Sequence, residues 1–388
     1  MLKNISTQVS TAALLPQPSK KIFYIDRLRV ILTVLVVLHH VLITYGAPGG
    51  WYYSQKSTNI AAVSLMTMIV TINQSFFMGF FFFLSAYFIR PSYEKKGAVR
   101  FVTDRLLRLG IPLVFYSFIL SPVLSYLVYY FGKGNQISFF QYLHGFDDWI
   151  DFGVLWFVAA LLLFTFIYVL WRMIVKNNQS KKLATQSFNF ILLFAGGIGV
   201  VSFFTRTIFP VGWILKYTGF QLGYFPQYIA LFILGLIASK NKWLDTMTFQ
   251  TGKRSLKSSM RLLLFFPIFL LIEKTTSMSQ DWFTSGFHWQ QLLFAVWEQL
   301  MGFSIIVALL CYGKQLWNKS STLLTKLSRY AFAVYIFHPL VIISLSLALR
   351  NWAVDPAIKF LLVAPLAVAG SFLLASVIVL IPGVKKII

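Results

Sequence analysis

Long apolar runs alternate with short polar segments along almost the whole chain. A run of about 20 apolar residues can cross the hydrocarbon core of a bilayer, about 30 Å thick, as a helix. The pattern therefore predicts an all-α, polytopic membrane protein with about ten transmembrane helices. The ten runs lie near residues 28–46, 65–89, 109–131, 152–171, 188–205, 224–239, 258–272, 289–312, 330–349 and 357–381, and the seventh is the shortest.

The segments between the runs are too short for a separate soluble domain. We expect a cytoplasmic tail at residues 1–21, a transmembrane domain at 22–384 and a short cytoplasmic tail at 385–388. The first twenty residues are polar and contain no small-residue cleavage site after an apolar core. The first run is therefore expected to be a retained helix and not a signal peptide.

Composition and charge agree with a membrane location. Hydrophobic residues make up 58% of the chain, charged residues only 12%, and the mean hydropathy is +0.73, which is outside the range of soluble domains. If both termini are cytoplasmic, 27 of the 34 Lys and Arg lie on the cytoplasmic side, as the positive-inside bias requires. The net charge of +23 thus reflects topology. The other seven bases are Lys56, Lys133, Arg206, Lys216, Lys274, Arg350 and Lys359.

The same charge pattern bears on partners and location. Outside the spans no basic stretch is interleaved with aromatic residues that could stack on bases, so we expect no nucleic acid partner. Anionic lipids of the inner leaflet are the favoured partners of the cytoplasmic bases. The predicted location is a cell membrane, as a multi-pass protein of a bacterial inner or plasma membrane.

Two adjacent histidines end the apolar stretch RVILTVLVVLHH at residues 29–40. Eleven residues separate Arg29 from His40, which places His40 about 16 Å from the cytoplasmic end, near the bilayer midplane. Eleven steps of 100° end about 20° beyond three full turns, so both residues share one helix face, whereas His39 points about 100° away. His40 either forms a packing hydrogen bond to a neighbouring helix or faces a wet or substrate-filled cavity, and the second reading is favoured.

Two further ionisable groups reach a similar depth. Glu298 lies about 12 Å below the outer end of its helix, and His338 lies about 13 Å from the inner face. Glu298 is expected to be protonated, paired with a histidine or in contact with water; its alternative is a neutral acid bonded to a backbone carbonyl or to Gln299. For His338 the structural alternative is equally strong, because Pro339 frees a carbonyl that can accept the ring N–H.

A pair of arginines lies at the cytoplasmic start of the third span. Arg105 and Arg108 are three residues apart and are predicted to project from one helix face. Two guanidinium groups suit a phosphate or diphosphate, because each planar fork donates two hydrogen bonds to adjacent oxygens. The alternative is that they only contribute to the positive-inside charge.

Four segments together resemble one family. Arg29 and His40 in R-x10-H spacing, the R-x-x-R of Arg105 and Arg108, GVLWFVAALLLF at 153–164 and SRYAFAVYIFHPL at 328–340 are similar to segments of the integral-membrane acyltransferase-3 family. This family includes O-acetyltransferases of surface polysaccharides and a glucan succinyltransferase, and the resemblance covers about residues 22–381. Where many members have a Ser-Gly-Phe-like turn after span 2, this chain has LSAYF at 84–88, which weakens any role for Ser85.

The resemblance implies transfer of an acetyl or succinyl group from cytoplasmic acyl-CoA to a hydroxyl of an extracytoplasmic or lipid-linked carbohydrate. It implies that Arg105 and Arg108 hold the CoA phosphates and that His40 is the general base, assisted by Arg29, with Glu298 as an orienting acid. Two further candidate site residues are His338 and Trp156. Direct transfer and an acyl-His40 intermediate both stay open, and no metal is expected.

Other functions fit parts of the pattern. A ten-span transporter or flippase would use His40, Glu298 and His338 as a proton relay, but the internal repeats and broken helices of such proteins are not evident. An O-acyltransferase of the unrelated Asn and His type lacks a convincing Asn partner. Residues of the outer loops either contact a sugar or lie at the membrane interface; these are Trp51, Tyr52, Tyr53, Asp147, Asp148, Trp149 and Asp151.

Overall fold

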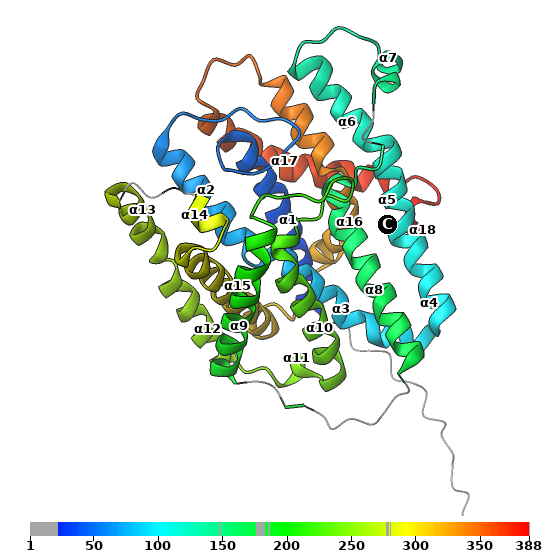
Figure 1. Ribbon diagram of the computed structural model, residues 1–388. Coiled ribbons are helices and arrows are strands. Elements are labelled where there is room, and N and C mark those ends of the chain that lie inside the picture. Colours follow the sequence, from blue (N-terminus) through cyan, green and yellow to red (C-terminus); the bar gives the residue numbers. More distant parts are fainter. Residues whose placement is uncertain are drawn as a thin grey trace, which may run out of the picture.

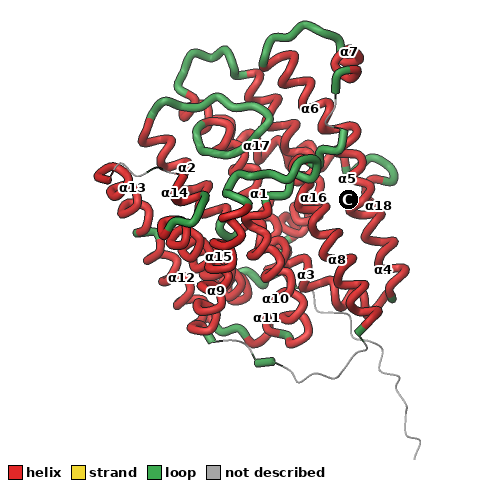
Figure 2. The backbone as a smooth tube through the Cα atoms, in the orientation of Figure 1, coloured by secondary structure: helices red, strands yellow, loops and turns green. Residues whose placement is uncertain are grey.

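The computed structural model of the chain describes residues 22–146, 149–175, 183–184, 187–276, 279 and 281–387. The expected tail at 1–21, the two candidates Asp147 and Asp148, and the last residue lie outside the described residues. Within those ranges the chain forms helices joined by turns and loops, with no β-strand (Figure 2). The fold class is all-α, as the hydrophobic pattern predicts.

Nine helical stretches in the described part of the chain are long and apolar enough to cross a membrane. Each coincides with one of the ten predicted runs, so nine of them are confirmed and the protein is a multi-pass membrane protein. The stretches are α1 (Phe23–Tyr45), α2 and α3 (Ile60–Gln74 and Phe77–Lys96), α4 to η3 (Ala98–Gly132), η4 and α8 (Gly153–Leu155 and Trp156–Ile174), α9 (Phe188–Ile208), η5 and α10 (Leu222–Tyr224 and Phe225–Asn241), α15 (Trp289–Leu316), α16 (Thr322–Ala348) and α17 (Pro356–Ile378).

The third of these stretches is a chain of short elements with three π-helical turns. A π-helical turn widens the helix and is frequent at functional sites. The elements are α4 (Ala98–Arg105), η1 (Leu106–Gly110), α5 (Ile111–Phe115), η2 (Tyr116–Leu120), α6 (Ser121–Leu127) and η3 (Val128–Gly132), of which η1, η2 and η3 are π-helical.

The seventh predicted run does not form one continuous span. Its residues belong to α12 (Phe249–Leu262) and α13 (Phe265–Thr276), which are separated by a turn at Leu263 and Leu264. With 14 and 12 residues, α12 and α13 are each shorter than the roughly 18 residues that a span requires, and α12 also carries exposed bases such as Lys257. The remaining short helices are α7 (Phe139–His144), α11 (Trp243–Thr246), α14 (Asp281–Thr284) and α18 (Val384–Ile387).

Helix α1 lies at the centre of the bundle. It packs against α2, α3, α15, α16 and α17, and its residues Leu28, Leu32, Val37 and Val41 are fully buried (Figure 1). The neighbouring α15 closely approaches the break between α2 and α3, where a Cβ on Gly302 would clash with the carbonyl oxygen of Ser75. A glycine is therefore required at this contact.

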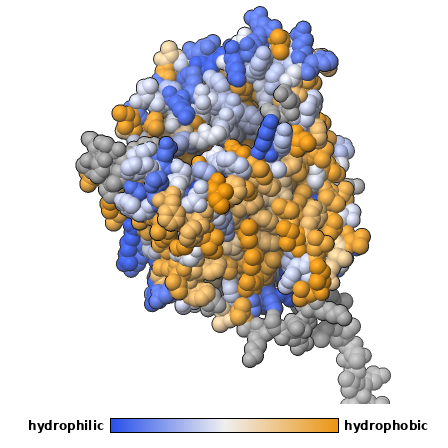
Figure 3. All heavy atoms as spheres, viewed as in Figure 1, coloured by the Kyte–Doolittle hydropathy of each residue, from blue (hydrophilic) through white to orange (hydrophobic). Residues whose placement is uncertain are grey.

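The surface agrees with a membrane-embedded bundle. Figure 3 shows a broad apolar band, with hydrophilic residues gathered toward the top of the molecule and at its lower edge. The same view shows a hollow near the top of this face, between the hydrophilic cap and the apolar band. In Figure 1 the N-terminal end of α1 lies toward the bottom, and the loop that follows α1 lies at the top.

Two bases that the charge pattern assigns to the outer loops lie inside the bundle instead. Arg206 of α9 is 0% exposed and Lys359 of α17 is 2% exposed. A buried cation must be paired or hydrogen-bonded to be tolerated, so both side chains need partners inside the protein.

Candidate active site

The two adjacent histidines of α1 face different neighbours. The Nδ1 atom of His39 lies 3.1 Å from the side-chain nitrogen of Asn73 on α2, and its ring stacks on Phe77 at 4.9 Å. The ring of His40 instead stacks on Trp51 of the following loop, with centroids 4.0 Å apart. The split that helical spacing predicts is present, and His39 serves to join α1 to α2.

His40, Trp51 and His338 form one group of stacked rings, here called the histidine stack. The rings of His40 and His338 are 5.3 Å apart and inclined by 21°, and the rings of Trp51 and His338 are 6.1 Å apart. Helices α1 and α16 and the loop at residues 46–59 each supply one member. The structure thus brings together two histidines that the sequence places 298 positions apart.

Each ring of the histidine stack has a buried nitrogen without a hydrogen-bond partner among the described residues. These atoms are Nδ1 of His40, Nε1 of Trp51 and Nε2 of His338. A buried polar atom without a partner costs about 1–3 kcal/mol. The three rings that carry these atoms are stacked on one another, and the His40 ring is half-buried, so the three nitrogens are available to a polar ligand.

The tautomer of His338 follows from its contacts. Its Nδ1 lies 2.9 Å from the carbonyl oxygen of Tyr335 and 3.2 Å from that of Val334. Carbonyls only accept hydrogen bonds, so Nδ1 carries the proton and the neutral ring keeps its lone pair on Nε2. The Tyr335 carbonyl is available because Pro339 has no N–H to bind it. The hydrogen bond from the His338 ring to a carbonyl freed by Pro339 is therefore present. It leaves the basic Nε2 of His338 without a partner in the histidine stack.

Tyr335 and Tyr52 adjoin the histidine stack, with rings 6.1 Å from His338 and 5.4 Å from Trp51, and meet η4 on its other side. The hydroxyl of Tyr335 donates to the carbonyl of Val154, and the hydroxyls of Tyr52 and Tyr116 are 2.9 Å apart. Burial raises the pKa of Tyr52, so this phenol stays protonated at neutral pH. Gly153 has φ +44°, and a Cβ there would lie 2.5 Å from the Tyr52 oxygen. Only glycine therefore lets the chain pass between these phenols.

The outer-loop candidates divide into two groups. Trp51 belongs to the histidine stack, Tyr52 meets Trp51 edge to face at 5.4 Å, and Asp151 accepts hydrogen bonds from the hydroxyl of Ser121 at 2.9 Å and from the amide of Gly153 at 2.8 Å. Trp149 instead packs on Phe146 and is 37% exposed.

The three predicted arginines gather at the other end of α1. Arg29 forms an ion pair with Asp26 at 3.5 Å and lies 5.0 Å from the centre of the Phe88 ring. Arg29 and Arg108 both lie within electrostatic reach of Arg105. Arg108 is exposed within the π-helical turn η1, and Arg105 is half-buried. The structure therefore joins the arginines of the first and third spans in one basic cluster.

Glu298 pairs with an arginine, and not with a histidine as one of the alternatives from the sequence has it. Glu298 accepts a hydrogen bond from Arg206 in a fully buried ion pair, and the Gln299 amide donates to the same carboxylate at 3.3 Å. Arg206 is also bonded to the Gly223 carbonyl at 3.1 Å. This ion pair argues against Glu298 as the orienting acid of His40, and against the proton relay of His40, Glu298 and His338 in the transporter alternative.

Other buried polar atoms on the two helices of this ion pair have no partner among the described residues. They include the hydroxyl of Ser202 on α9 and the side-chain amide of Gln291 on α15, both fully buried. Groups of this kind are commonly satisfied by buried water. They differ from the histidine stack, whose members include two imidazoles that can accept and return a proton.

Trp156 lies outside the histidine stack. Its ring packs 5.5 Å from Tyr228 and 6.5 Å from Phe82. Through the preceding Leu155 it adjoins Val154, whose carbonyl holds Tyr335. Sequence reasoning does not identify Tyr335, Tyr116 or Asn73, because no local spacing indicates which tyrosine or asparagine meets a distant helix.

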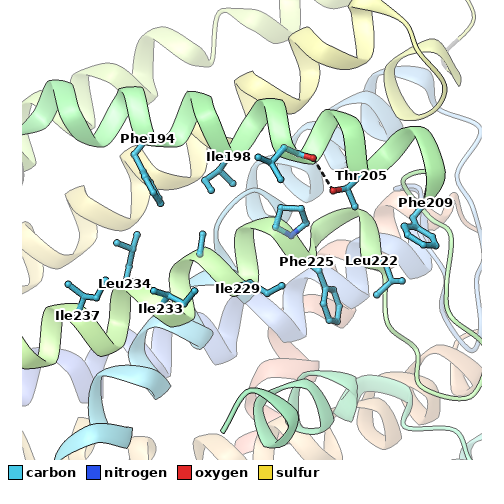
Figure 4. Close-up of a pocket in the computed structure, with 13 residues that line it drawn as sticks. Phe194, Ile198, Thr205, Phe209, Leu222, Phe225, Ile229, Ile233, Leu234 and Ile237 are labelled. Atoms are coloured by element: carbon cyan, nitrogen blue, oxygen red, sulfur yellow. Dashed lines mark hydrogen bonds between the residues drawn. The ribbon is translucent and has the colours of Figure 1, made fainter. Parts of the chain in front are cut away.

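Two apolar grooves lie away from the histidine stack. One, of 610 Å³, runs between α9 and α10 and is lined by residues such as Ile198, Phe225 and Ile233 (Figure 4). The other, of 290 Å³, is lined by residues such as Phe83, Phe190 and Leu310. The described residues that line the two grooves include no ionisable side chain, so neither groove supplies the chemistry of an active site.

Comparison with known families identifies the class. The acyltransferase-3 family, described as an acyltransferase domain, matches residues 22–377. The chain therefore belongs to this family, the resemblance of the four segments is confirmed, and the protein is a membrane acyltransferase.

Individual relatives are more distant. The chain is similar to the glucans biosynthesis protein C of Escherichia coli O81 (strain ED1a), with 25% identity over 337 residues that cover 83% of this chain and 82% of the relative. For the protein of the same name from Escherichia coli K12, the identity is 23% over 336 residues, with the same coverage. No solved structure matches the chain.

The contact between Arg206 and Glu298 yields a prediction. Glu298→Gln should lower the thermal midpoint in detergent markedly, because removing one partner of a buried ion pair costs about 3–5 kcal/mol. Glu94→Gln is the matched control, because the Glu94 side chain is 43% exposed where it pairs with Arg90 and, at 3.9 Å, with Arg172, so its loss should change little. A Glu298→Gln variant with an unchanged midpoint but no acyl transfer would instead return Glu298 to the catalytic machinery.

Proposed function

We propose that the protein transfers an acetyl or succinyl group from acyl-CoA, bound at the arginine cluster on the cytoplasmic side, to a carbohydrate hydroxyl that reaches the histidine stack from the opposite side. The observation that carries this proposal is the histidine stack itself, which presents three nitrogens without partners in the described chain and lies at the opposite end of α1 from the arginine cluster. A carbohydrate acceptor is favoured because the relatives are glucans biosynthesis proteins.

The arginine cluster suits the donor. CoA carries phosphates, and arginine forks bind phosphate oxygens through paired hydrogen bonds. Arg29 and His40 are eleven residues apart on one helix, about 16 Å along its axis. An extended pantetheine arm spans such a distance, so phosphates held by Arg29, Arg105 and Arg108 place the thioester beside the histidine stack.

The histidine stack supplies the acid–base chemistry. The lone pair of a neutral imidazole, on His40 or on Nε2 of His338, removes the proton of the acceptor hydroxyl as its oxygen attacks the thioester carbonyl. The tetrahedral intermediate collapses with cleavage of the C–S bond, and the imidazolium returns the proton to the leaving thiolate. The Nε1–H group of Trp51 is the donor of the stack and can hold an oxygen of either substrate. An acyl group carried transiently by His40 is compatible with the same arrangement.

His40 and His39 make a matched pair for mutation. His40→Ala should reduce acyl transfer from labelled acyl-CoA by at least about 100-fold, because a positioned general base contributes about 10²–10⁴-fold. His39→Ala should fold less stably, because it loses the bond to Asn73, yet keep much of its activity per folded molecule. The measurement is transfer in proteoliposomes, normalised to folded protein by gel filtration. Equal loss of activity per folded molecule in both variants would contradict the assignment.

The arginine cluster yields a second prediction. Arg105→Gln combined with Arg108→Gln should raise the KM for acyl-CoA more than it lowers kcat, because contacts remote from the carbonyl act mainly in binding. Lysines at both positions should restore binding only in part, since they lack the planar fork. The control removes two exposed arginines of α12, Arg254 and Arg261, and should leave the KM unchanged. Normal CoA affinity of the double variant in calorimetry would show that these arginines only set topology.

A further inference from the structure

The loop that carries Trp51 is fastened along the end of α1. The backbone N–H of Gln55 donates to the carbonyl of Thr44 at 2.8 Å, and the backbone N–H of Ser57 donates to the carbonyl of Tyr45 at 3.0 Å. Between α1 and Gln55 the loop contains three glycines and a proline in the sequence GAPGGW at residues 46–51. A glycine-rich backbone does not by itself fix the position of the Trp51 side chain. That position therefore depends on the contacts that hold the rest of the loop.

A buried lysine holds one side of this loop. Lys359, near the start of α17, donates from Nζ to the side-chain oxygen of Gln55 at 3.1 Å and to the carbonyl of Arg350 at 3.2 Å. The side-chain amide nitrogen of Gln55 also donates to the Arg350 carbonyl at 2.9 Å, so Lys359, Gln55 and Arg350 form a triangle of hydrogen bonds. Burial of an ammonium group is costly and is tolerated here because these oxygens surround it.

An aspartate four residues earlier holds the other side. Asp355 caps α17 through the amide of Ala357 at 2.8 Å and accepts the hydroxyl of Ser57 at 2.7 Å. These hydrogen bonds keep the pKa of Asp355 below its ordinary value, so it stays ionised at neutral pH. Lys359 and Asp355 therefore form hydrogen bonds to two residues of the loop, Gln55 and Ser57.

We propose that Lys359 is a positioning residue which, through Gln55, holds Trp51 over His40. This inference rests on the proposed function of the histidine stack, because Trp51 matters only if His40 does chemistry. Within the described part of the chain, Lys359 itself forms no hydrogen bond to His40 or Trp51. Its effect passes along the loop, from Gln55 to the indole four residues before it.

The test combines a lysine variant with loss of the indole. Lys359→Met should lower kcat for acyl transfer by about tenfold while leaving the KM for acyl-CoA within about twofold, because the donor site is at the other end of α1. Introduced into a Trp51→Ala protein, Lys359→Met should cause no further loss, since residues that act as a unit are not additive. Lys56→Met is the matched control, because Lys56 is exposed in the same loop. Further loss in the Trp51→Ala background would overturn the proposal.

A second readout does not depend on acyl transfer. Diethyl pyrocarbonate modifies accessible imidazoles, and mass spectrometry measures the rate at His40. Lys359→Met should speed this modification about tenfold because the indole no longer covers the ring. Gln55→Met, which removes the bond to Lys359 and the bond from Gln55 to the Arg350 carbonyl, should do likewise if Lys359→Met fails to fold. An unchanged rate in a folded variant overturns the positioning role. A faster rate in the variant, together with a parent protein that shows no acyl transfer, leaves this role intact and refutes the proposed function.

Discussion

The cost of an unpaired polar atom in an apolar helix bundle is the constraint that organises this protein. Polar side chains along the spans are held by specific partners: His39 by Asn73, Glu298 by Arg206, and Gln227 by the Ser75 carbonyl at 2.6 Å. Each of these bonds joins segments that are distant in the sequence and therefore helps to define the packing of the bundle. Among the buried atoms without a partner in the described residues, those of the histidine stack are distinguished because they lie on three stacked rings, two of them imidazoles. An arrangement that is unfavourable for folding alone is what a substrate site requires.

The position of the histidine stack along α1 shapes the proposed chemistry. His40 lies five residues before the helix ends at Tyr45, so it is nearer to the loop with Trp51 than a midplane estimate suggests. The arginine cluster lies at the opposite end of the same helix. A single central helix thus separates a cationic site from an acid–base site by about the length of an extended CoA arm. The loop over His40 is the part of the site that an acceptor from the opposite side meets first.

The sequence predicts the architecture better than the contacts within the site. Hydrophobic runs are long-range averages, so nine of the ten predicted spans are confirmed. The seventh run is not among them, because a turn at Leu263 and Leu264 divides its residues between the two shorter helices α12 and α13. Helical periodicity separates His39 from His40, and Pro339 indicates the carbonyl that holds His338. The partner of Glu298 could not be predicted, because in the sequence Arg206 resembles any other base of an outer loop. The stacking of Trp51 on His40 could not be predicted either, since it depends on a loop whose position is fixed by hydrogen bonds to Lys359 and Asp355.

The most direct test of the account is the direction of transfer across a sealed membrane. Proteoliposomes of known orientation would receive labelled acyl-CoA on one side and a glucan acceptor on the other. The account predicts that acyl-CoA is consumed only from the face that bears Arg105 and Arg108, and that acylated glucan appears only on the face that bears Trp51. Consumption of acyl-CoA from the Trp51 face, or product that stays on the donor side, would contradict it.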